Sequence, residues 1–463
     1  MNNTRTTKRA LLSSVMAVLI CVAMLIGTTF AWFTDSASTA VNKIQAGTLD
    51  IGLEMKNASG NWVNAEGETL SWKKAAGAPV DEQVLWEPGC TYELPDLRLV
   101  NNGDLWLKVR VYINGIKGDA KLLEAIEFTA TYETEDEQSQ TLTIGTDGTI
   151  TEFNDQAMFP LSTTGGNYIK IKGHMKESAG NEYRGLSIDG IGITVVATQY
   201  TYENDSTTDQ YDANAVYPIV ANTQAELNGA IASAQSGSAV STEVVLPAGN
   251  FKLENGTAQN KNITISGTKD TVVTVVGDTG SQMNYQNGAT LAFEGVTIQG
   301  QTAGNYGGIA HVAKTTFVNC TFNGKLTLYG DATFINCTFI NKNDYAIWTW
   351  GAKNAEFIGC TFDSGGKALL LYGGAGSTET PTTNLTVTDC VFNDDNTLDT
   401  DKAAIEIGND YNAVYNLTVN NNITVNGFAV NPAGISTGSN IWANKNSMDQ
   451  AHLNVVINGV DVY

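Results

Sequence analysis

The feature that most constrains the fold is a six-residue motif that recurs through the second half of the chain. Its clearest copies are residues 317–322 (FVNCTF), 334–339 (FINCTF) and 357–362 (FIGCTF), and looser copies occupy 293–298, 387–392, 419–424 and 457–462. Taken as equivalent, Val296, Cys320, Cys337, Cys360, Cys390, Asn422 and Val460 are separated by 17 to 38 residues. Short β-branched and aromatic strands at such an irregular interval, with Asn and Gly turns, are typical of a solenoid. The repeat therefore predicts a parallel β-helix over residues 216–463.

Alternation within the motif predicts its buried side chains. In an extended strand Val318, Cys320 and Phe322 point to one side, and Asn319 and Thr321 to the other. Stacked coils would bury the first set as ladders of like residues, about 4.8 Å apart. At that spacing cysteines either pack as small apolar side chains or form disulfides. Because five cysteines, an odd number, follow residue 31, we expect free, packed thiols at Cys320, Cys337, Cys360 and Cys390.

A short helix is predicted before the first coil. Thr223 and Glu226 form a capping box, and Leu227, Ala230, Ile231 and Ala234 follow at helical spacing. Such a helix would cover the open apolar end of the β-helix. Residues 222–253, together with the coils, resemble the start of pectate-lyase-like right-handed β-helices. That resemblance implies the fold and leaves the activity open.

The first half of the chain has a different sequence pattern and lacks the repeat. Strand-like alternation covers residues 50–55, 106–114, 128–132 and 190–202, and residues 120–126 could form a short helix. These segments predict an antiparallel sandwich over residues 32–202. The polar residues 203–215 are expected to be a linker.

The N-terminus is typical of a secretory signal. Arg5, Lys8 and Arg9 precede an uncharged run over residues 10–26, and small residues follow before Ala31. This order predicts cleavage after Ala31 and export of the chain. The alternative is an uncleaved membrane anchor, because the apolar run approaches spanning length.

The leader junction and several later motifs resemble the camelysin/TasA family of secreted biofilm-matrix proteins. The matching segments are residues 31–35 (AWFTD), Asn42, residues 46–51 (AGTLDI), 86–89 (WEPG), 100–103 (VNNG) and 195–199 (VVATQ). The resemblance implies a jelly-roll sandwich, cleavage by a dedicated signal peptidase, and a place in the matrix or on the cell surface. It also implies self-assembly by insertion of a freed N-terminal segment, here residues 32–53, into the next subunit.

The chain departs from that family by carrying a long β-helix, which puts simple fibre formation in doubt. Some family members are called metalloproteases. The three histidines, His174, His311 and His452, lie too far apart in the sequence to form HExxH or another ligand spacing. The protease activity is therefore not carried over to this chain.

The charge of the chain excludes one class of partner and disfavours two others. The net charge is −22, and residues 216–463 carry 20 acidic and 10 basic side chains. This field repels a phosphate backbone, which argues against nucleic-acid binding. Anionic membranes and polyuronates are disfavoured by the same field.

An aromatic strip is predicted on the outside of the β-helix. Four segments of the repeat can be aligned with one another: residues 326–329, 347–350, 369–372 and 405–408. Alternation along these segments places six side chains inside the β-helix: Ile347, Thr349, Leu369, Leu371, Ile405 and Ile407. Tyr329, Trp350 and Tyr372 then stack outside on successive coils, with Trp348 and Leu370 alongside. Exposed aromatic rings suit sugar rings or another protein. The alternative is that a loop such as residues 373–383 covers the strip.

Catalysis by carboxylates is the rival hypothesis. Asp363, Asp389, Asp394 and Asp395 lie near strand ends on consecutive coils and could hydrolyse a glycosidic bond. No arginine follows Arg184, so a lyase would depend on lysine. The structural alternative is that Asp and Asn cap the turns of the β-helix.

No cofactor is predicted with the possible exception of calcium. Oxygens of Asp395, Asp399 and Asp401 could wrap a calcium ion, although the loop lacks the glycine and the terminal glutamate of an EF-hand. Together these features predict an exported all-β protein of two domains. Its β-helix would bind polysaccharide or surface proteins without turnover, and the alternative is a secreted polysaccharide lyase or glycoside hydrolase.

Overall fold

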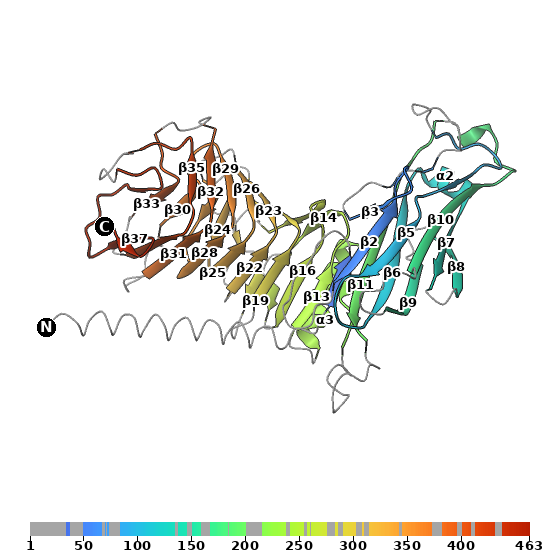
Figure 1. The fold of residues 1–463 in the computed structure, drawn as a ribbon, viewed down its shortest axis with the longest axis horizontal. Coiled ribbons are helices and arrows are strands. Elements are labelled where there is room, and N and C mark those ends of the chain that lie inside the picture. Colours follow the sequence, from blue (N-terminus) through green and yellow to red (C-terminus); the bar gives the residue numbers. More distant parts are fainter. Residues whose placement is uncertain are drawn as a thin grey trace.

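The computed structural model describes residues 34–37, 50–66, 70, 72–73, 84–134, 138–145, 151–158, 167–183, 185–200, 215–237, 241–253, 257–259, 261–275, 283–285, 290–301, 308–309, 314–341, 345–372, 382–395, 401–408, 413–430 and 438–463. They form two lobes that lie end to end (Figure 1). Strands of the first lobe pair antiparallel. Those of the second pair almost entirely parallel, so the predicted all-β fold is confirmed.

Two antiparallel sheets make up the first lobe. The four-stranded sheet has the order β1-β11-β6-β9, with β1 at Thr34–Ala37, β11 at Ile188–Gln199, β6 at Leu107–Gly118 and β9 at Thr151–Met158. The other has the order β3-β2-β5-β10-β7-β8, with β4 also on β10: β3 is Trp62–Asn64, β2 Ile51–Lys56, β5 Leu97–Asn101, β10 Asn167–Met175, β7 Ile126–Glu133, β8 Ser139–Ile144 and β4 Thr91–Glu93. Alternate side chains such as Val109, Val111, Phe128 and Ile171 fill the core.

The predicted elements of this lobe are confirmed. β2, β6, β7 and β11 occupy the four segments with strand-like alternation, and helix α2 (Ala120–Ala125) occupies the short helical segment. A 3-10 helix, η1 (Asn181–Tyr183), precedes β11. The linker lies mostly outside the described residues, which resume at Ala215.

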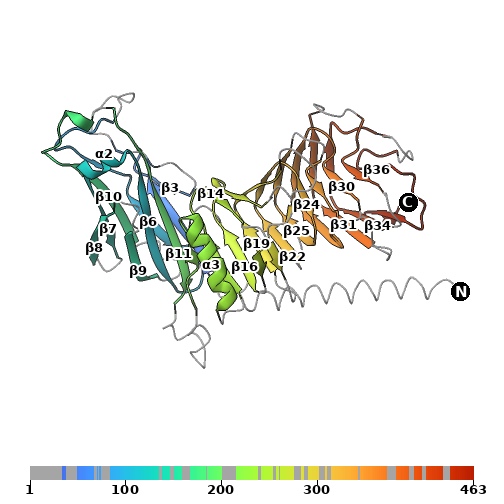
Figure 2. The same cartoon turned by 180° about the vertical axis from the view of Figure 1, so that it is seen from behind.

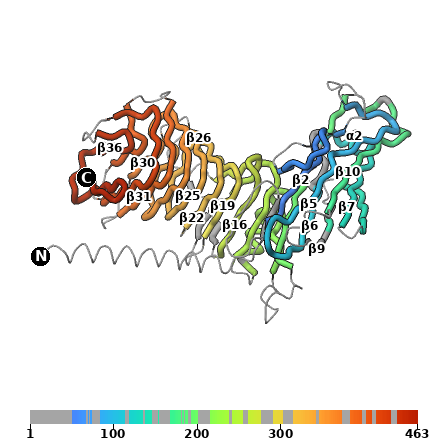
Figure 3. Tube along the Cα trace, viewed as in Figure 1, coloured from blue at the N-terminus to red at the C-terminus, as the bar shows by residue number. Residues whose placement is uncertain are grey.

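Three parallel sheets wind into the β-helix, as the stacked coils of Figure 3 show. The first sheet contains β12 (Ile219–Val220), β13 (Ser241–Val245), β16 (Asn262–Ser266), β19 (Thr290–Glu294), β22 (Lys314–Val318), β25 (Asp331–Ile335), β28 (Asn354–Ile358), β31 (Thr382–Thr388), β34 (Val414–Asn420), β37 (Leu453–Ile457) and β38 (Val460–Asp461). The second contains β14 (Gly249–Lys252), β17 (Thr271–Thr274), β20 (Thr297–Gln299), β23 (Thr321–Asn323), β26 (Thr338–Asn341), β29 (Thr361–Ser364), β32 (Val391–Asp394) and β35 (Thr424–Asn426). The third contains β21 (Gly308–Ile309), β24 (Leu326–Leu328), β27 (Ile347–Trp348), β30 (Leu369–Leu371), β33 (Ile405–Ile407) and β36 (Trp442–Asn444). A separate pair joins β15 (Thr257–Gln259) to β18 (Met283–Tyr285).

The six-residue motif is a bend between two strands. Its third residue is left-handed in every copy, with φ of 67° at Gly295, 53° at Asn319, 52° at Asn336, 63° at Gly359, 53° at Asp389, 59° at Asn421 and 77° at Gly459. Gly, Asn and Asp tolerate this conformation better than other residues. The bend breaks the two-residue alternation, so the prediction that Val318 points inward is wrong. Phe317 is fully buried instead, and Val318 is half-buried on the outside.

Inside the helix the motif builds three ladders. Phe293, Phe317, Phe334 and Phe357 stack along the first sheet with ring centroids 4.5 to 5.1 Å apart. Phe322, Phe339, Phe362 and Phe392 stack along the second at 4.4 to 4.8 Å. Between them lie Cys320, Cys337, Cys360 and Cys390, all buried and free, which confirms the expected packed thiols.

The last two copies of the motif deviate from the predicted alignment. Thr424 pairs with Val391, so Ile423 and not Asn422 packs in the position of Cys390. The strand β38 folds back antiparallel on β37, which leaves Val460 63% exposed. Val460 is therefore part of a terminal hairpin and does not continue the interior ladder.

The entry to the β-helix follows the prediction. Helix α3 (Gln224–Ser236) starts with the capping box of Thr223 and Glu226. Leu227, Ala230 and Ile231 are buried in the β-helix core. Figure 2 shows α3 across the end of the β-helix that lies nearest the sandwich.

Candidate functional site

The outer face of the third sheet carries a file of side chains that changes from coil to coil. Parallel pairing brings Thr327 next to Trp348, Trp348 next to Leu370, Leu370 next to Glu406, and Glu406 next to Ala443. The residues that flank this file, such as Ile347, Leu369 and Ile405, point into the core as predicted. The file is therefore on the outside of the coils.

Aromatic side chains gather around this file in a cluster of their own, separate from the main core. We call it the outer cluster: Tyr345, Trp348, Leu370 and Tyr372, with Trp350 packed against them. Edge-to-face contacts join the rings, with centroids 5.9 Å apart for Tyr345 and Trp348 and 4.8 Å for Trp348 and Trp350.

The predicted exposed strip is therefore wrong for two of its four aromatic residues. Trp348 and Tyr372 are each only 9% exposed. Trp350 and Tyr329 are half-buried and reach the surface. Trp348 packs against the rings of Tyr345 and Trp350, and Tyr372 belongs to the same cluster. Most of the loop at residues 373–383, the alternative cover, lies outside the described residues.

Tyr372 has a specific seat. A Cβ atom at Gly408 would lie 1.8 to 2.0 Å from three atoms at the end of the tyrosine side chain, so the ring needs glycine at this position. Its hydroxyl donates to Asn446 Oδ1 at 3.3 Å. The alignment of residues 405–408 with residues 369–372 placed Gly408 level with Tyr372, but it did not predict this contact.

Beside the outer cluster, a buried carboxylate gathers three lysines. Glu406 Oε1 lies 3.1 Å from Lys445 Nζ and 3.7 Å from Lys367 Nζ, and Oε2 lies 3.9 Å from Lys402 Nζ. Side-chain exposure is 6% for Glu406 and Lys367, 23% for Lys402 and 48% for Lys445. Lys402 also pairs with Asp401 at 3.8 Å. This group was not predicted from the sequence. The indication in the sequence was that Glu406, a charged residue, aligns with Trp348 and Leu370.

A further lysine lies on the other side of the outer cluster. The ammonium of Lys325 lies 5.1 Å from the ring centroid of Tyr345, and the residue is 8% exposed. This cation–π contact places positive charge at both ends of the aromatic cluster.

The carboxylates of the catalytic hypothesis serve the stacking of coils. Asp363 accepts a hydrogen bond of 2.9 Å from Asn393 Nδ2. Asp389 is a left-handed turn residue whose carboxylate accepts from Asn421 Nδ2 and from the backbone N–H of Asn422. These contacts match the structural alternative of turn caps.

The other two residues of that hypothesis end the next strand. Asp394 is half-buried at the end of β32, and Asp395 is exposed, with its backbone N–H donating to Ser364 O. Of the calcium candidates, Asp399 lies outside the described residues, and Asp395 and Asp401 are exposed. Within the described ranges, no three His, Cys, Asp or Glu side chains are placed to share a metal ion. Calcium binding stays a prediction.

Three of the stacked cysteines have thiols that are difficult to ionise. Burial raises the pKa of the Cys337 thiol. Hydrogen bonding to the Cys337 thiol raises the pKa of Cys360 to about 12, and hydrogen bonding to Cys360 raises that of Cys390. A thiol must ionise to act as a nucleophile, so these three are poor candidates for catalysis.

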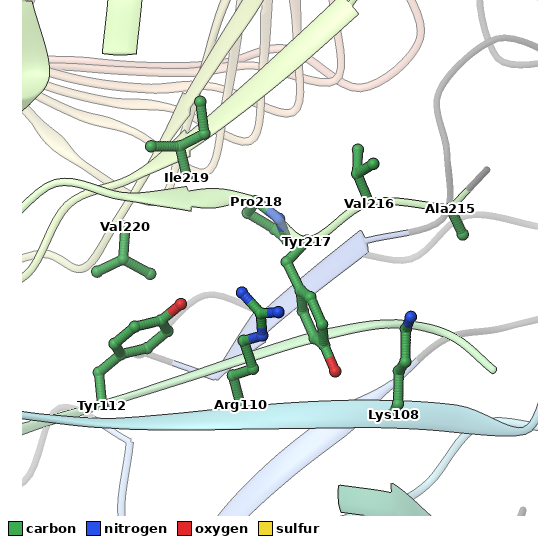
Figure 4. Close-up of a pocket in the computed structure, with 9 residues that line it drawn as sticks. All are labelled: Lys108, Arg110, Tyr112, Ala215, Val216, Tyr217, Pro218, Ile219 and Val220. Atoms are coloured by element: carbon green, nitrogen blue, oxygen red, sulfur yellow. The ribbon is translucent and has the colours of Figure 1, made fainter. Parts of the chain in front are cut away.

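A pocket of about 570 Å³ lies where the sandwich meets the β-helix (Figure 4). Its lining consists of Lys108, Arg110, Tyr112, Ala215, Val216, Tyr217, Pro218, Ile219 and Val220. The Arg110 guanidinium lies 4.1 Å and the Lys108 ammonium 5.3 Å from the centroid of the Tyr217 ring. These cation–π contacts attach the segment that enters β12 to strand β6.

The predicted leader and its cleavage site at Ala31 lie outside the described residues. Among the described helices, none is long and apolar enough to cross a membrane. The predicted donor segment is described only in part. In this chain β1 pairs antiparallel with β11, and β2 pairs in the other sheet, so self-assembly stays a prediction.

Comparisons with known families match both halves. Residues 6–60 match the family described as camelysin metallo-endopeptidase, and residues 255–450 match the right handed beta helix region. The first match is consistent with a secreted or surface protein. A search of curated proteins gave no match.

A solved structure also shows a distant likeness. It is the catalytic unit of a thermostable GH87 alpha-1,3-glucanase from Streptomyces thermodiastaticus strain HF3-3, 12% identical over 74% of this chain and 76% of that one. The TM-score of 0.24 is too low to carry an argument about this chain. What the family matches establish is that the N-terminal segment resembles camelysin and the C-terminal half resembles right-handed β-helices, as their motifs predict.

Proposed function

We propose that this chain is an exported cell-surface or extracellular-matrix protein whose β-helix binds glycan without turning it over. One observation carries the proposal: aromatic side chains on consecutive coils form a cluster outside the main core, and Trp350 and Tyr329 reach the surface. Aromatic faces suit the apolar faces of sugar rings.

The buried members of the cluster have a supporting role in this proposal. Trp348 packs edge-to-face against Trp350, and Tyr372 is fixed by Gly408 and Asn446. Rings held in this way lose little freedom when a ligand binds, and such preorganisation favours affinity.

The rival enzymatic function has less support. The oxygens of Asp363 and Asp389 accept hydrogen bonds from the next coil, and a general acid or base needs to face its substrate. The match of residues 6–60 to camelysin supports the exported location.

A binding and turnover assay on the full chain tests the proposal. The chain is passed over immobilised plant, host and bacterial polysaccharides, and retention and released products are measured together. We expect retention without products, and loss of retention in Trp350→Ala. The matched control is Trp106→Ala, which removes a tryptophan that is 38% exposed on the sandwich.

The outcomes separate the two functions. Released sugars that disappear in Asp394→Ala or Asp395→Ala would establish the enzyme. Equal loss of retention in both tryptophan variants, or retention of the chain by no polysaccharide, would reject the outer cluster as a glycan site.

A further inference from the structure

The outer face of the second sheet carries two regular files of side chains. Its labelled strands lie side by side along one side of the β-helix (Figure 1), and parallel pairing keeps their residues in register. One file consists of Val272, Thr297, Thr321, Thr338, Thr361, Val391 and Thr424. The other, which we call the amide file, consists of Lys252, Thr274, Gln299, Asn323, Ile340, Asp363, Asn393 and Asn426.

One member of the amide file is a strongly exposed apolar side chain. The phenylalanines between the two files point into the core, so both files point outward. Ile340 is 42% exposed, and its strand β26 pairs with β23 on one side and β29 on the other. Among the described residues, it is the one large apolar side chain of such exposure on a strand with neighbours at both edges. An exposed apolar residue within a flat sheet is suited to the centre of a contact surface.

The charged residues of the two files restrict how a second copy of the chain could pack on them. These residues are Lys252 and Asp363. If two copies met through their amide files with the helix axes parallel, each coil would face the same coil of the other copy. Asp363 would then lie against Asp363 of the partner subunit, and like charges opposed in an interface are unfavourable. Charge therefore disfavours the parallel arrangement.

Antiparallel packing removes this conflict. A two-fold axis through Ile340 places each coil opposite the coil that lies equally far on the other side of Ile340. Asp363, one coil after Ile340, then faces Asn323 of the partner subunit, one coil before it. The Asp363 carboxylate already accepts a hydrogen bond of 2.9 Å from Asn393 Nδ2. A carboxylate can accept further bonds and an amide can donate them, so the facing side chains are complementary.

The size of the face indicates a weak dimer. The strands from β17 to β35 that would overlap span about 29 Å along the helix axis, at roughly 4.8 Å for each spacing. With about 13 Å across the strands, each copy would bury roughly 400 Å². A total of about 800 Å² is at the low end for transient complexes. The dissociation constant should therefore lie above about 10 µM.

We propose that the outer face of the second sheet is a self-association surface, on which a second copy of this chain packs antiparallel around Ile340. This inference is independent of the proposed glycan binding, which uses the outer cluster beside the third sheet. It also differs from self-assembly through the sandwich, because no residue of the first lobe takes part.

Sedimentation velocity over about 1–500 µM protein tests the association. The sample is the chain from residue 32 onward, the form that cleavage after Ala31 would leave. We expect a dimer fraction that rises with concentration. Ile340→Asp places two charges at the two-fold axis and should weaken association at least about tenfold. The matched control is Ile335→Asp, which adds the same charge to an outward, half-buried isoleucine of the same coil on the first sheet. We expect the control to change association less than about twofold.

Three results of this experiment would overturn the proposal. They are a monomer over the whole concentration range, equal weakening in the two variants, and association that Ile340→Asp leaves unchanged. The last result would mean that the copies meet through another surface. Thermal unfolding of both variants shows whether they are folded.

Cross-linking with a short bismaleimide tests the antiparallel arrangement without adding charge. The cysteines of the interior ladder are buried, and Cys90 is replaced in a Cys90→Ser background. Ile340→Cys should cross-link two copies, because this position lies next to itself across the two-fold axis. Asn426→Cys, also at an exposed position, should not, because its two copies would lie about 29 Å apart. Equal cross-linking at both positions, or none at Ile340→Cys where the parent forms dimers, would overturn the inference.

Discussion

The interior and the outer surface of the β-helix use the same coils in opposite ways. Inside, a position repeats the same residue: Phe334 and Phe357 stack at 4.5 Å with ring planes 3° apart. Outside the third sheet, equivalent positions hold threonine, tryptophan, leucine, glutamate and alanine in turn. Stacking of like residues stabilises a solenoid. The buried side chains outside the third sheet do not repeat, so stacking of like residues does not explain them. Departures from local sequence rules are concentrated at functional sites.

Not every outer surface abandons the repeat. On the first sheet, Asn354 Nδ2 donates to Asp331, Asn384 Nδ2 to Asn354 and Asn416 Nδ2 to Asn384, at 2.8 to 2.9 Å. This ladder is external but regular, as architecture requires. The contrast singles out the third sheet among the outer faces.

The largest expected effect comes from breaking an interior ladder. Phe357→Ala removes a fully buried ring and should lower the free energy of unfolding by about 3–5 kcal/mol. Guanidinium unfolding of the variant measures it. The control is the neighbouring Ile358→Ala, half-buried on the outer side, for which we expect about 1 kcal/mol. Equal losses in the two variants would break the distinction between inside and outside.

Alkaline pH should lower the free energy of unfolding through the buried thiols of the interior. Cys337, Cys360 and Cys390 have pKa values raised in the folded state above the ordinary 9.0, to about 12 for Cys360. Above pH 9 the unfolded chain loses these protons while the folded chain keeps them, so stability falls as the pH rises. The loss is on the order of 1.4 kcal/mol per thiol for each pH unit, up to about pH 12. Denaturant unfolding between pH 8 and 11 measures it.

A variant with alanine at all three positions supplies the comparison for this effect. It should be less stable at pH 7, because cavities replace the sulfur atoms, but should show a shallower decline above pH 9. Parallel declines in the two proteins would mean that the thiols do not carry the alkaline effect.

The β-helix could be predicted from the sequence because each of its coils repeats the same motif. The coils were located by the equivalent positions of Cys320, Cys337, Cys360 and Cys390, and helix α3 was located by the capping box at Thr223. It failed at Val318, because period-two alternation assumes a continuous strand and the turn at Asn319 interrupts it. A left-handed residue cannot be recognised from its neighbours alone, although Asn and Gly at equivalent positions were a usable signal.

The candidate site was predicted less completely. The aromatic residues were found by aligning coils, but their burial depends on how rings of adjacent coils pack, which the alignment does not contain. Glu406 and its lysines escaped notice because Lys367, Lys402 and Lys445 lie on three separate connections between strands. Only the folded coils bring them to one carboxylate.

A smaller effect is expected from the bend. Asn319 is exposed with a φ of 53°, a conformation that costs a residue such as alanine roughly 1–2 kcal/mol. Asn319→Ala should lower the free energy of unfolding by about that amount, measured by denaturant titration. Asn319→Gly, which accepts positive φ without strain, should stay within about 0.5 kcal/mol of the parent. Equal losses in both variants would assign the effect to the asparagine side chain.

A loss of stability of similar size, with a specific change in the outer cluster, is expected from Gly408→Ala. The new Cβ would overlap the end of the Tyr372 side chain, so the ring has to move out of its buried position and lose its hydrogen bond to Asn446. The loss should therefore be about 1–3 kcal/mol, the usual range for overpacking. Because the ring leaves the outer cluster, tryptophan emission should shift to the red as Trp348 becomes more exposed. Gly351→Ala is the contrast, since its Cβ would lie 2.9 Å from the backbone oxygen of Tyr329 and no side-chain rotation can relieve it. If Gly408→Ala instead destabilised the protein as much as Gly351→Ala did, Tyr372 would be held as rigidly as the interior ladders, and the outer face would belong to the architecture.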